Sequence, residues 1–361
     1  MPTMKRSKES SEASETTVEP FDNLQHQDTQ VILDTFEHLR SLGIEDDVPL
    51  PRLVVAGDTS SGKSSVLMRI TNIVFPSGEG VVTRFATEVA MRPADEHSIK
   101  VRILPHSNRK GDERARILRF KPEMHSFSDY PDIHARATEL MSAGCGSSAG
   151  LLRDVLRIEV AGPKNAPLTI IDLPGLIHAT SATVTQADLE LSHKLVEEYM
   201  AHPLTIILAV VSATNELENQ AITQKARKVD PEGLRTMGIV TKPDAVAGQK
   251  KNEQGWMSVV QNKNISLMQG WHALVNKSED DEDASLDDIQ IAETEFFSDE
   301  RFAKLDSNTL GLENLLERLS CMVYEHVTAA LPGIEQQMQH KLKAAKSGLE
   351  KLGAARADPQ S

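Results

Sequence analysis

The sequence has 361 residues, enough for about two domains of ordinary size. Charged residues make up 25% of it and apolar residues 39%, a balance typical of globular proteins in water. The formal net charge of −14 argues against a nucleic-acid partner, because phosphate backbones attract basic surfaces, and the two cysteines lack metal-ligand spacing and favour a reducing, cytoplasmic environment.

The N-terminal part precedes the first strand. Ser, Glu and Thr dominate residues 1–20, and this composition predicts a disordered tail. Apolar residues then recur at helical spacing through residues 21–45, with Ile32, Phe36 and Leu39 among them, which predicts a first helix. We expect this helix to lie outside a minimal nucleotide-binding domain.

A phosphate-binding loop is predicted at residues 57–65, between an apolar run typical of a strand and a helix-compatible run. Gly57 and Gly62 allow a tight turn in which successive N–H groups point at phosphate oxygens, at the positive end of the helix. Lys63 is expected to reach the outer phosphates, but the loop alone does not distinguish ATP from GTP. The expected nucleotide contacts are Asp58, Thr59, Ser60, Ser61, Gly62, Lys63, Ser64 and Ser65.

Three residues are expected to hold Mg²⁺. The Ser64 hydroxyl would bind it directly, and Asp172, at the end of an apolar strand, would bind it through water. Thr83 would add a second hydroxyl and hold the attacking water through its backbone; the alternative is an ordinary threonine at the start of a strand. The N–H of Gly175, which closes the Asp-x-x-Gly motif, would contact the γ-phosphate.

The residue after this motif bears on catalysis. Ras-like enzymes have a glutamine there that orients water, whereas this chain has Leu176. Because leucine cannot orient water, we expect another device to do so. His178, two residues later, is interpreted as an exposed loop residue rather than a base.

Strands that alternate with helices predict an α/β fold. A Pro/Gly/Asn turn at 162–167 lies between two apolar runs and predicts a hairpin of those two strands. The whole pattern predicts a mainly parallel central sheet flanked by helices. The predicted strands after the phosphate loop are 87–91, 99–103, 155–160, 168–171, 205–211, 236–240 and 272–275, with a helix at 129–141.

A second motif, Thr241–Asp244, selects the nucleotide. The Asp244 carboxylate can accept the ring and exocyclic N–H groups of guanine, whereas adenine would face it with an acceptor. Lys242 would lie across the base or brace the phosphate loop. Asn276 and Lys277, after the last predicted strand, would close the base pocket. These residues predict GTP.

The C-terminal part carries two apolar stripes at helical spacing, and they meet at Pro332. The pattern predicts a helix that caps the domain, an interruption, and a second helix over residues 332–353. Pro332 would be a hinge between them or an ordinary kink without motion. Residues 354–361 are predicted to be disordered.

The motifs, in this order and spacing, resemble the dynamin superfamily, with a Mx-like character in the segment 82–88. The resemblance covers residues 22–352 and includes residues 57–67, 82–84, 172–175, 208–210, 229–236 and 241–244. It implies the P-loop GTPase fold over residues 46–331, as a GTPase domain whose hydrolysis is stimulated when two copies dimerise across their nucleotide faces. It also implies a helical bundle beside that domain, built from the first helix and the helix after Pro332.

The resemblance also assigns roles to single residues. Ser60, with the carbonyls of Gly78 and Gly80, would bind K⁺ or Na⁺ in place of an arginine finger. Asp230 lies in a loop that resembles the family's contact across the dimer. Thr59 departs from the family, in which most members have glutamine there. Catalytic roles fall on Ser60, Lys63, Thr83 and Gly175.

We therefore expect a GTPase that uses Mg²⁺ and K⁺ or Na⁺, forms homodimers and couples hydrolysis to movement about Pro332. The alternative is a catalytically weak GTP-binding module, or a truncated regulator of a full-length dynamin-like protein. Family members continue into a stalk, so the chain is expected to be a fragment or a natural short form. A full-length form would be cytoplasmic and could associate with organelle membranes.

Overall fold

The structure is a computed structural model that describes residues 52–71, 73, 75, 83–143, 150–163, 165, 168–181, 184–216, 220–276 and 285–352. The predictions for the tail at 1–20, the first helix at 21–45 and the segment 354–361 lie outside these residues. So do those for Gly78, Gly80 and Lys277.

The described strands form one sheet in the order β3-β4-β2-β5-β1-β6-β7-β8. The strands are β1 (Arg52–Gly57), β2 (Ala86–Pro93), β3 (Ser98–Leu104), β4 (Val155–Gly162), β5 (Thr169–Asp172), β6 (Thr205–Ser212), β7 (Thr236–Thr241) and β8 (Trp271–Leu274). Strands β5, β1, β6, β7 and β8 are mutually parallel, while β2 runs antiparallel to β5. Strand β4 pairs parallel with β2, and β3 pairs antiparallel with β4. This confirms the predicted mainly parallel α/β sheet.

The predicted hairpin of the strands on either side of residues 162–167 is wrong. Strand β2 lies between β4 and β5, so that Val89 pairs with Ile158 on one side and with Ile170 on the other. All four residues of β5 are buried, and the strand needs a partner along each edge, which β1 and β2 supply. The Pro/Gly/Asn turn correctly predicted that the chain reverses direction between β4 and β5, but it could not predict that β2 lies between these two strands.

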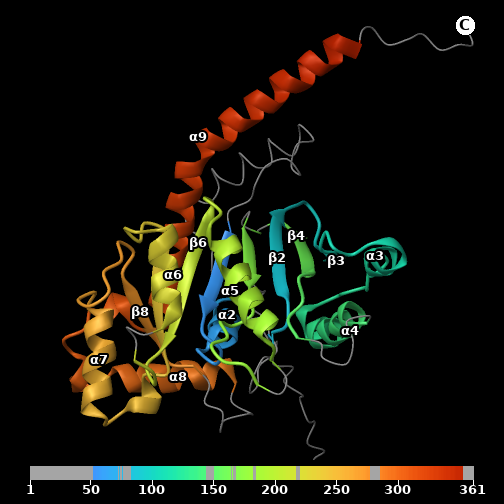
Figure 1. Cartoon of the computed structure of the whole chain (residues 1–361). Coiled ribbons are helices and arrows are strands. Elements are labelled where there is room, and N and C mark those ends of the chain that lie inside the picture. The colour runs from blue at the N-terminus through green and yellow to red at the C-terminus, as the bar shows by residue number, and fades with distance from the viewer. Residues whose placement is uncertain are drawn as a thin grey trace, which may run out of the picture.

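Helices cover both faces of the sheet (Figure 1). They are α2 (Lys63–Thr71), α3 (Gly111–Leu118), α4 (Tyr130–Ser142), α5 (Gln186–Met200), α6 (Ala221–Val229), α7 (Lys250–Val260), α8 (Leu286–Phe297) and α9 (Leu312–Leu352). The predicted helix at 129–141 corresponds to α4, whereas α3 was not anticipated from the pattern.

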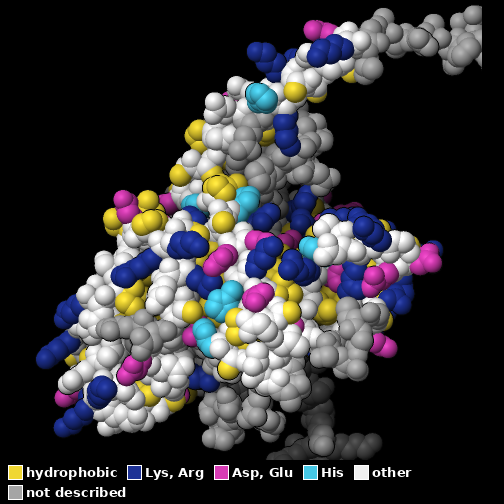
Figure 2. Space-filling view, in the orientation of Figure 1, with side chains coloured by type: hydrophobic (Ala, Val, Ile, Leu, Met, Phe, Trp, Pro, Cys, Tyr) yellow, Lys and Arg dark blue, Asp and Glu magenta, His cyan; other side chains and the backbone are white. Residues whose placement is uncertain are grey.

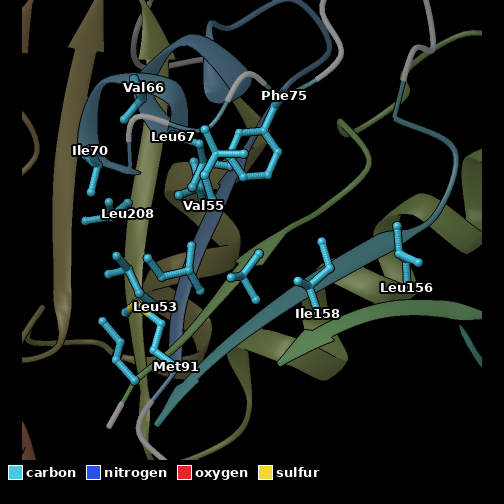
Figure 3. Close-up of a cluster of buried hydrophobic side chains, with 14 of the residues drawn as sticks. Leu53, Val55, Val66, Leu67, Ile70, Phe75, Met91, Leu156, Ile158 and Leu208 are labelled. Carbon is cyan, nitrogen blue, oxygen red and sulfur yellow. The ribbon is translucent and has the colours of Figure 1, made fainter. Parts of the chain in front are cut away.

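Alternate residues of β1 enter two hydrophobic cores. Leu53 and Val55 belong to a core on one face, together with Val66, Leu67 and Ile70 of α2 (Figure 3). The same core includes residues of α4 and of the first half of α9. Val54 and Ala56 pack on the other face with α5, α6 and α7. Because each strand side chain points opposite to its neighbour, a continuous apolar run is what a strand covered on both faces requires.

Helix α9 is one continuous helix of 41 residues with Pro332 inside it, so the predicted interruption is wrong. Figure 1 shows that α9 lies along the sheet and then changes direction as it projects away. Pro332 cannot donate to the carbonyl of Thr328, but both residues are exposed, so water can satisfy that carbonyl. The projecting part exposes Leu342 and Leu349.

Charges of both signs are interspersed on the face that Figure 2 shows. Within the described residues, no helix combines the length and the apolar character needed to cross a bilayer.

Candidate functional site

The predicted motif residues gather at one edge of the sheet. Parallel strands end at the same edge, so the loops after β1, β5, β7 and β8 lie together there. Strand β2 runs the opposite way, which brings the residues before it, including Thr83, to the same edge. The central sheet thus places the phosphate loop, the Asp-x-x-Gly loop and the residues predicted to receive the base, which follow β7 and β8, side by side.

The loop after β1 adopts a conformation that glycine makes possible. A Cβ on Gly57 would lie 2.3 Å from the Val210 carbonyl oxygen, so only glycine fits there. Gly62 has a φ of +91°, and its carbonyl accepts the Val66 N–H at 3.0 Å as α2 begins. Ser60 also has a positive φ, +61°, and is exposed at the tip of the turn.

Lys63 and Asp172 are buried at the centre of the site. The Lys63 Nζ donates to the Asp58 carbonyl at 2.8 Å, and burial lowers the pKa of Lys63 to about 8 although Asp172 and Asp58 oppose this. Burial raises the pKa of Asp172 to about 7, against the charge of Lys63 and a hydrogen bond from Thr83. Burial thus outweighs the opposite charges that the described residues place near each group. Phosphate oxygens would add negative charge near Lys63, and a divalent cation would add positive charge near Asp172.

The residues predicted to hold Mg²⁺ fit that ion. The hydroxyl of Thr83 lies 3.5 Å from Asp172 Oδ2, and Asp172 Oδ1 is buried without a hydrogen-bond partner among the described residues. Ser64 is the second residue of α2, at the start of the same helix as Lys63. Hydroxyl and carboxylate oxygens are the ligands that Mg²⁺ prefers.

The Asp-x-x-Gly loop is attached to the phosphate loop through Leu176. Leu176 forms an isolated parallel bridge with Asp58, and its N–H donates to the Gly57 carbonyl at 3.0 Å. Its own carbonyl accepts both the N–H and the hydroxyl of Thr59, each at 3.1 Å. The Leu176 side chain is fully buried in the core, so it has no part in orienting water.

This attachment gives Thr59 a role that the sequence did not reveal. Its short side chain ties the two loops together across 117 residues of sequence, and no spacing rule could have indicated this. Gly175 lies against the same backbone, because a Cβ there would come within 2.8 Å of Thr59 Cα and 3.0 Å of Lys63 Nζ. The Gly175 N–H is therefore carried by a segment packed on the phosphate loop.

His178 is half exposed, as predicted, but it also contacts the phosphate loop. Its Nε2 lies 3.1 Å from Asp58 Oδ1, without hydrogen-bond geometry. The ring also meets the edge of His193, with centroids 5.9 Å apart.

The residues predicted to recognise the base lie after β7 and β8. Burial raises the pKa of Asp244, and its Oδ1 is buried without a partner among the described residues. Asn276 is 8% exposed, and both atoms of its amide likewise lack a partner there. Unpaired buried polar atoms of this kind fit the polar edge of a base.

Thr241, predicted to contact the nucleotide, donates a hydrogen bond to the phosphate loop. Its hydroxyl donates to the Ser61 carbonyl at 2.6 Å and lies 3.2 Å from the Val211 carbonyl. Lys242, which was expected to lie across the base or brace the loop, has a φ of +56° that follows from the sharp turn after β7.

The structure does not place Asp230 at the nucleotide face. Asp230 lies just before β7, at the edge of the sheet opposite to the phosphate loop, and it is 6% exposed. Its carboxylate accepts the N–H groups of Leu234 and Arg235 and the hydroxyl of Thr236. Because the carboxylate is committed to its own loop, this geometry argues against the predicted contact across the dimer.

Comparison with known proteins identifies the family. The family model described as "Dynamin family" matches residues 53–243, more than half of the chain, and the one described as "Dynamin central region" matches residues 255–361. The chain is 30% identical over 335 residues to the interferon-induced GTP-binding protein Mx3 of Oncorhynchus mykiss, covering 91% of this chain and 51% of the relative.

Other relatives give the same result. The interferon-induced GTP-binding proteins Mx of Solea senegalensis and Ctenopharyngodon idella are each 30% identical, over 89% and 91% of this chain and 50% and 52% of their own lengths. The chain thus spans about half the length of the curated relatives it matches. On the family match and on the phosphate loop, Asp-x-x-Gly loop and base loops that share one sheet edge, the chain belongs to the dynamin family.

Proposed function

We propose that this chain binds GTP and hydrolyses it to GDP and phosphate. The observation that carries the proposal is the placement of two subsites along one sheet edge. Lys63, Asp172 and Thr83 form a subsite suited to phosphate and Mg²⁺. Asp244 and Asn276 leave unpaired polar atoms in the loops after β7 and β8. The relatives' names, which call them GTP-binding proteins, agree with this nucleotide.

Each residue has a defined part in the proposed reaction. Lys63 and the N–H groups of the loop hold the outer phosphates and stabilise the charge that develops on them. Ser64 and Thr83 would hold Mg²⁺ directly and Asp172 through water; when bound, the ion neutralises negative charge on the phosphates. The Thr83 backbone positions the attacking water, and the Gly175 N–H contacts the γ-phosphate from the segment that Thr59 and Leu176 fix.

A monovalent cation is the proposed substitute for the missing glutamine. Ser60 is exposed at the tip of the phosphate loop, where its hydroxyl is available to K⁺ or Na⁺. The carbonyls of Gly78 and Gly80 would complete the site. Two copies of the chain would dimerise across the nucleotide edge, which would enclose the cation and stimulate hydrolysis.

Movement of α9 is the conformational change that we propose GTP hydrolysis drives. The helix begins at the nucleotide edge, where the Leu310–Gly311 segment pairs with Ala273 of β8, and projects beyond the opposite edge. A hinge at the exposed Pro332 would let the projecting part change direction. In a full-length form this would act in the cytoplasm, with association at organelle membranes as a further proposal.

A catalytically weak GTP-binding module is the second candidate. It is favoured by the burial of Leu176 and by the engagement of the Thr59 hydroxyl, because neither side chain is free to orient water.

The deciding experiment is GTP turnover per molecule as a function of protein concentration, in K⁺, in Na⁺ and in a large organic cation. A rate that rises with concentration and requires K⁺ or Na⁺ supports the enzyme, whereas a flat rate near zero supports the module. Lys63→Ala is the control: undiminished hydrolysis by this variant would contradict the site assignment.

A further inference from the structure

A buried ion pair joins α2 to α8 outside all the predicted motifs. Arg69, near the end of α2, places its Nη2 2.9 Å from Glu293 Oε2, and both side chains are 1% exposed. The same nitrogen donates to Gln290 Oε1 at 2.5 Å. Burying two charges costs desolvation energy that their attraction only partly offsets, so a pair of this kind needs a reason beyond stability.

The pair holds the backbone of Val275, the first residue after β8. Glu293 Oε1 accepts the Val275 N–H at 2.9 Å, and Arg69 Nη1 donates to the Val275 carbonyl. Val275 lies beyond the sheet ladder and is 6% exposed. Both of its peptide groups therefore depend on this ion pair for hydrogen bonds.

Two further elements are fixed through the same contacts. The next residue along the chain is Asn276, whose buried amide belongs to the proposed base pocket. Glu293 Oε2 also accepts the N–H of Leu312, the first residue of α9, at 2.9 Å. One carboxylate thus binds the base loop and the start of the projecting helix.

Helix α2 sets the distance between the two subsites. It carries Lys63 at its start and Arg69 six residues later, about 9 Å along the helix axis. The phosphate subsite and the anchor of the base loop are therefore at opposite ends of one rigid element.

We propose that Arg69 and Glu293 are positioning residues that hold the loop after β8 in the geometry that receives the guanine base, and that join this loop to the first turn of α9. The proposal rests on the proposed GTP site.

The test is nucleotide binding by Glu293→Gln in the full chain. The glutamine keeps the shape but directs an NH₂ group at one of two N–H donors and leaves Arg69 without its counter-charge. We expect GDP, measured by displacement of a fluorescent GDP analogue, to bind at least tenfold more weakly. Inorganic tripolyphosphate, which contacts only the phosphate loop, should displace the analogue with an unchanged affinity.

Glu88→Gln is the matched control. Glu88 is also buried, and it accepts from Arg157 at 3.1 Å and from the hydroxyl of Tyr199, near the end of α5, at 2.9 Å. We expect it to lower the melting temperature while the affinity for GDP stays within twofold of wild type.

Hydrogen exchange tests the link to α9. GDP should slow exchange in the peptide that contains Leu312 in the wild-type chain and have no such effect in Glu293→Gln. If Glu293→Gln does not fold, the double variant Arg69→Met/Glu293→Leu removes both charges and should show the same selective loss of GDP affinity.

Three results separate the proposals. A folded Glu293→Gln that binds GDP as tightly as wild type overturns the inference. Equal weakening of GDP and tripolyphosphate also overturns it, because the damage would then not be specific to the base loop. A wild-type chain that binds tripolyphosphate but not GDP overturns the proposed function itself.

Discussion

Replacing Thr241 by valine tests whether β7 supports the phosphate loop. Thr241 is fully buried, and its hydroxyl has one proton, which the 2.6 Å separation assigns to the Ser61 carbonyl rather than to the Val211 carbonyl at 3.2 Å. Valine keeps the volume and removes that donor. Leaving a buried carbonyl without its partner costs about 1–3 kcal/mol, and we expect the free energy of unfolding to fall by that amount.

The same bond limits the effect on binding. If nucleotide requires the loop conformation that the bond supports, affinity can fall by no more than the energy lost, which is about 5- to 150-fold. Urea denaturation of the chain without nucleotide measures the stability, and titration with a fluorescent GDP analogue measures the affinity. Thr241→Ser retains the hydroxyl and should bind GDP as the wild type does.

Two outcomes would refute this reasoning. A Thr241→Val variant with unchanged stability would show that the short contact contributes no net energy. A variant that loses stability but keeps its affinity for GDP would show that the bond serves the fold and not the phosphate loop.

Three further predictions address other residues. Leu176→Gln should lower the free energy of unfolding by about 2–5 kcal/mol in urea denaturation, because an amide would replace a fully buried leucine, and a rise in GTP turnover would contradict the assigned burial. Asp244→Asn should shift the preference from guanine toward xanthine nucleotides in competition binding, and an unchanged preference would contradict the base pocket. Burial lowers the pKa of His272 to about 3; the hydrogen bond that its Nε2 donates to the Gly311 carbonyl opposes this shift, and the charge of Arg318 adds to it. The unfolded chain therefore binds a proton below about pH 6.5 that the folded chain does not. Stability should therefore fall on acidification between about pH 6.5 and 3, and His272→Gln should reduce the slope by up to about 1.4 kcal/mol per pH unit in urea denaturation; an unchanged slope would show that His272 is protonated in the folded state.

Much of the site could be predicted because its chemistry is local. Residues 52–71 form a strand, a glycine-containing turn and a helix in succession, so the phosphate loop can be recognised from the sequence. Asp172 and Asp244 were identified by short motifs that begin where strands end. The fold class followed from alternating strands and helices, whose periodicities are properties of neighbouring residues.

The errors concern contacts between segments distant in sequence. The hairpin prediction failed because strand order depends on which edges β5 must satisfy, and α9 was not interrupted because Pro332 faces water. Asp230 was placed at the nucleotide face by resemblance, whereas the direction of β7 puts it at the opposite edge.

The sequence by itself determined the phosphate loop, the Asp-x-x-Gly motif, the Thr241–Asp244 motif and the α/β class, because each depends on the spacing of residues that are close together in the chain. Only the tertiary structure decided that Thr59 and Thr241 hold the phosphate loop from two sides and that Arg69 and Glu293 hold the base loop. Those contacts join residues far apart in the chain, and hydrogen bonds between buried groups depend on which strands and helices come to lie together in the folded chain.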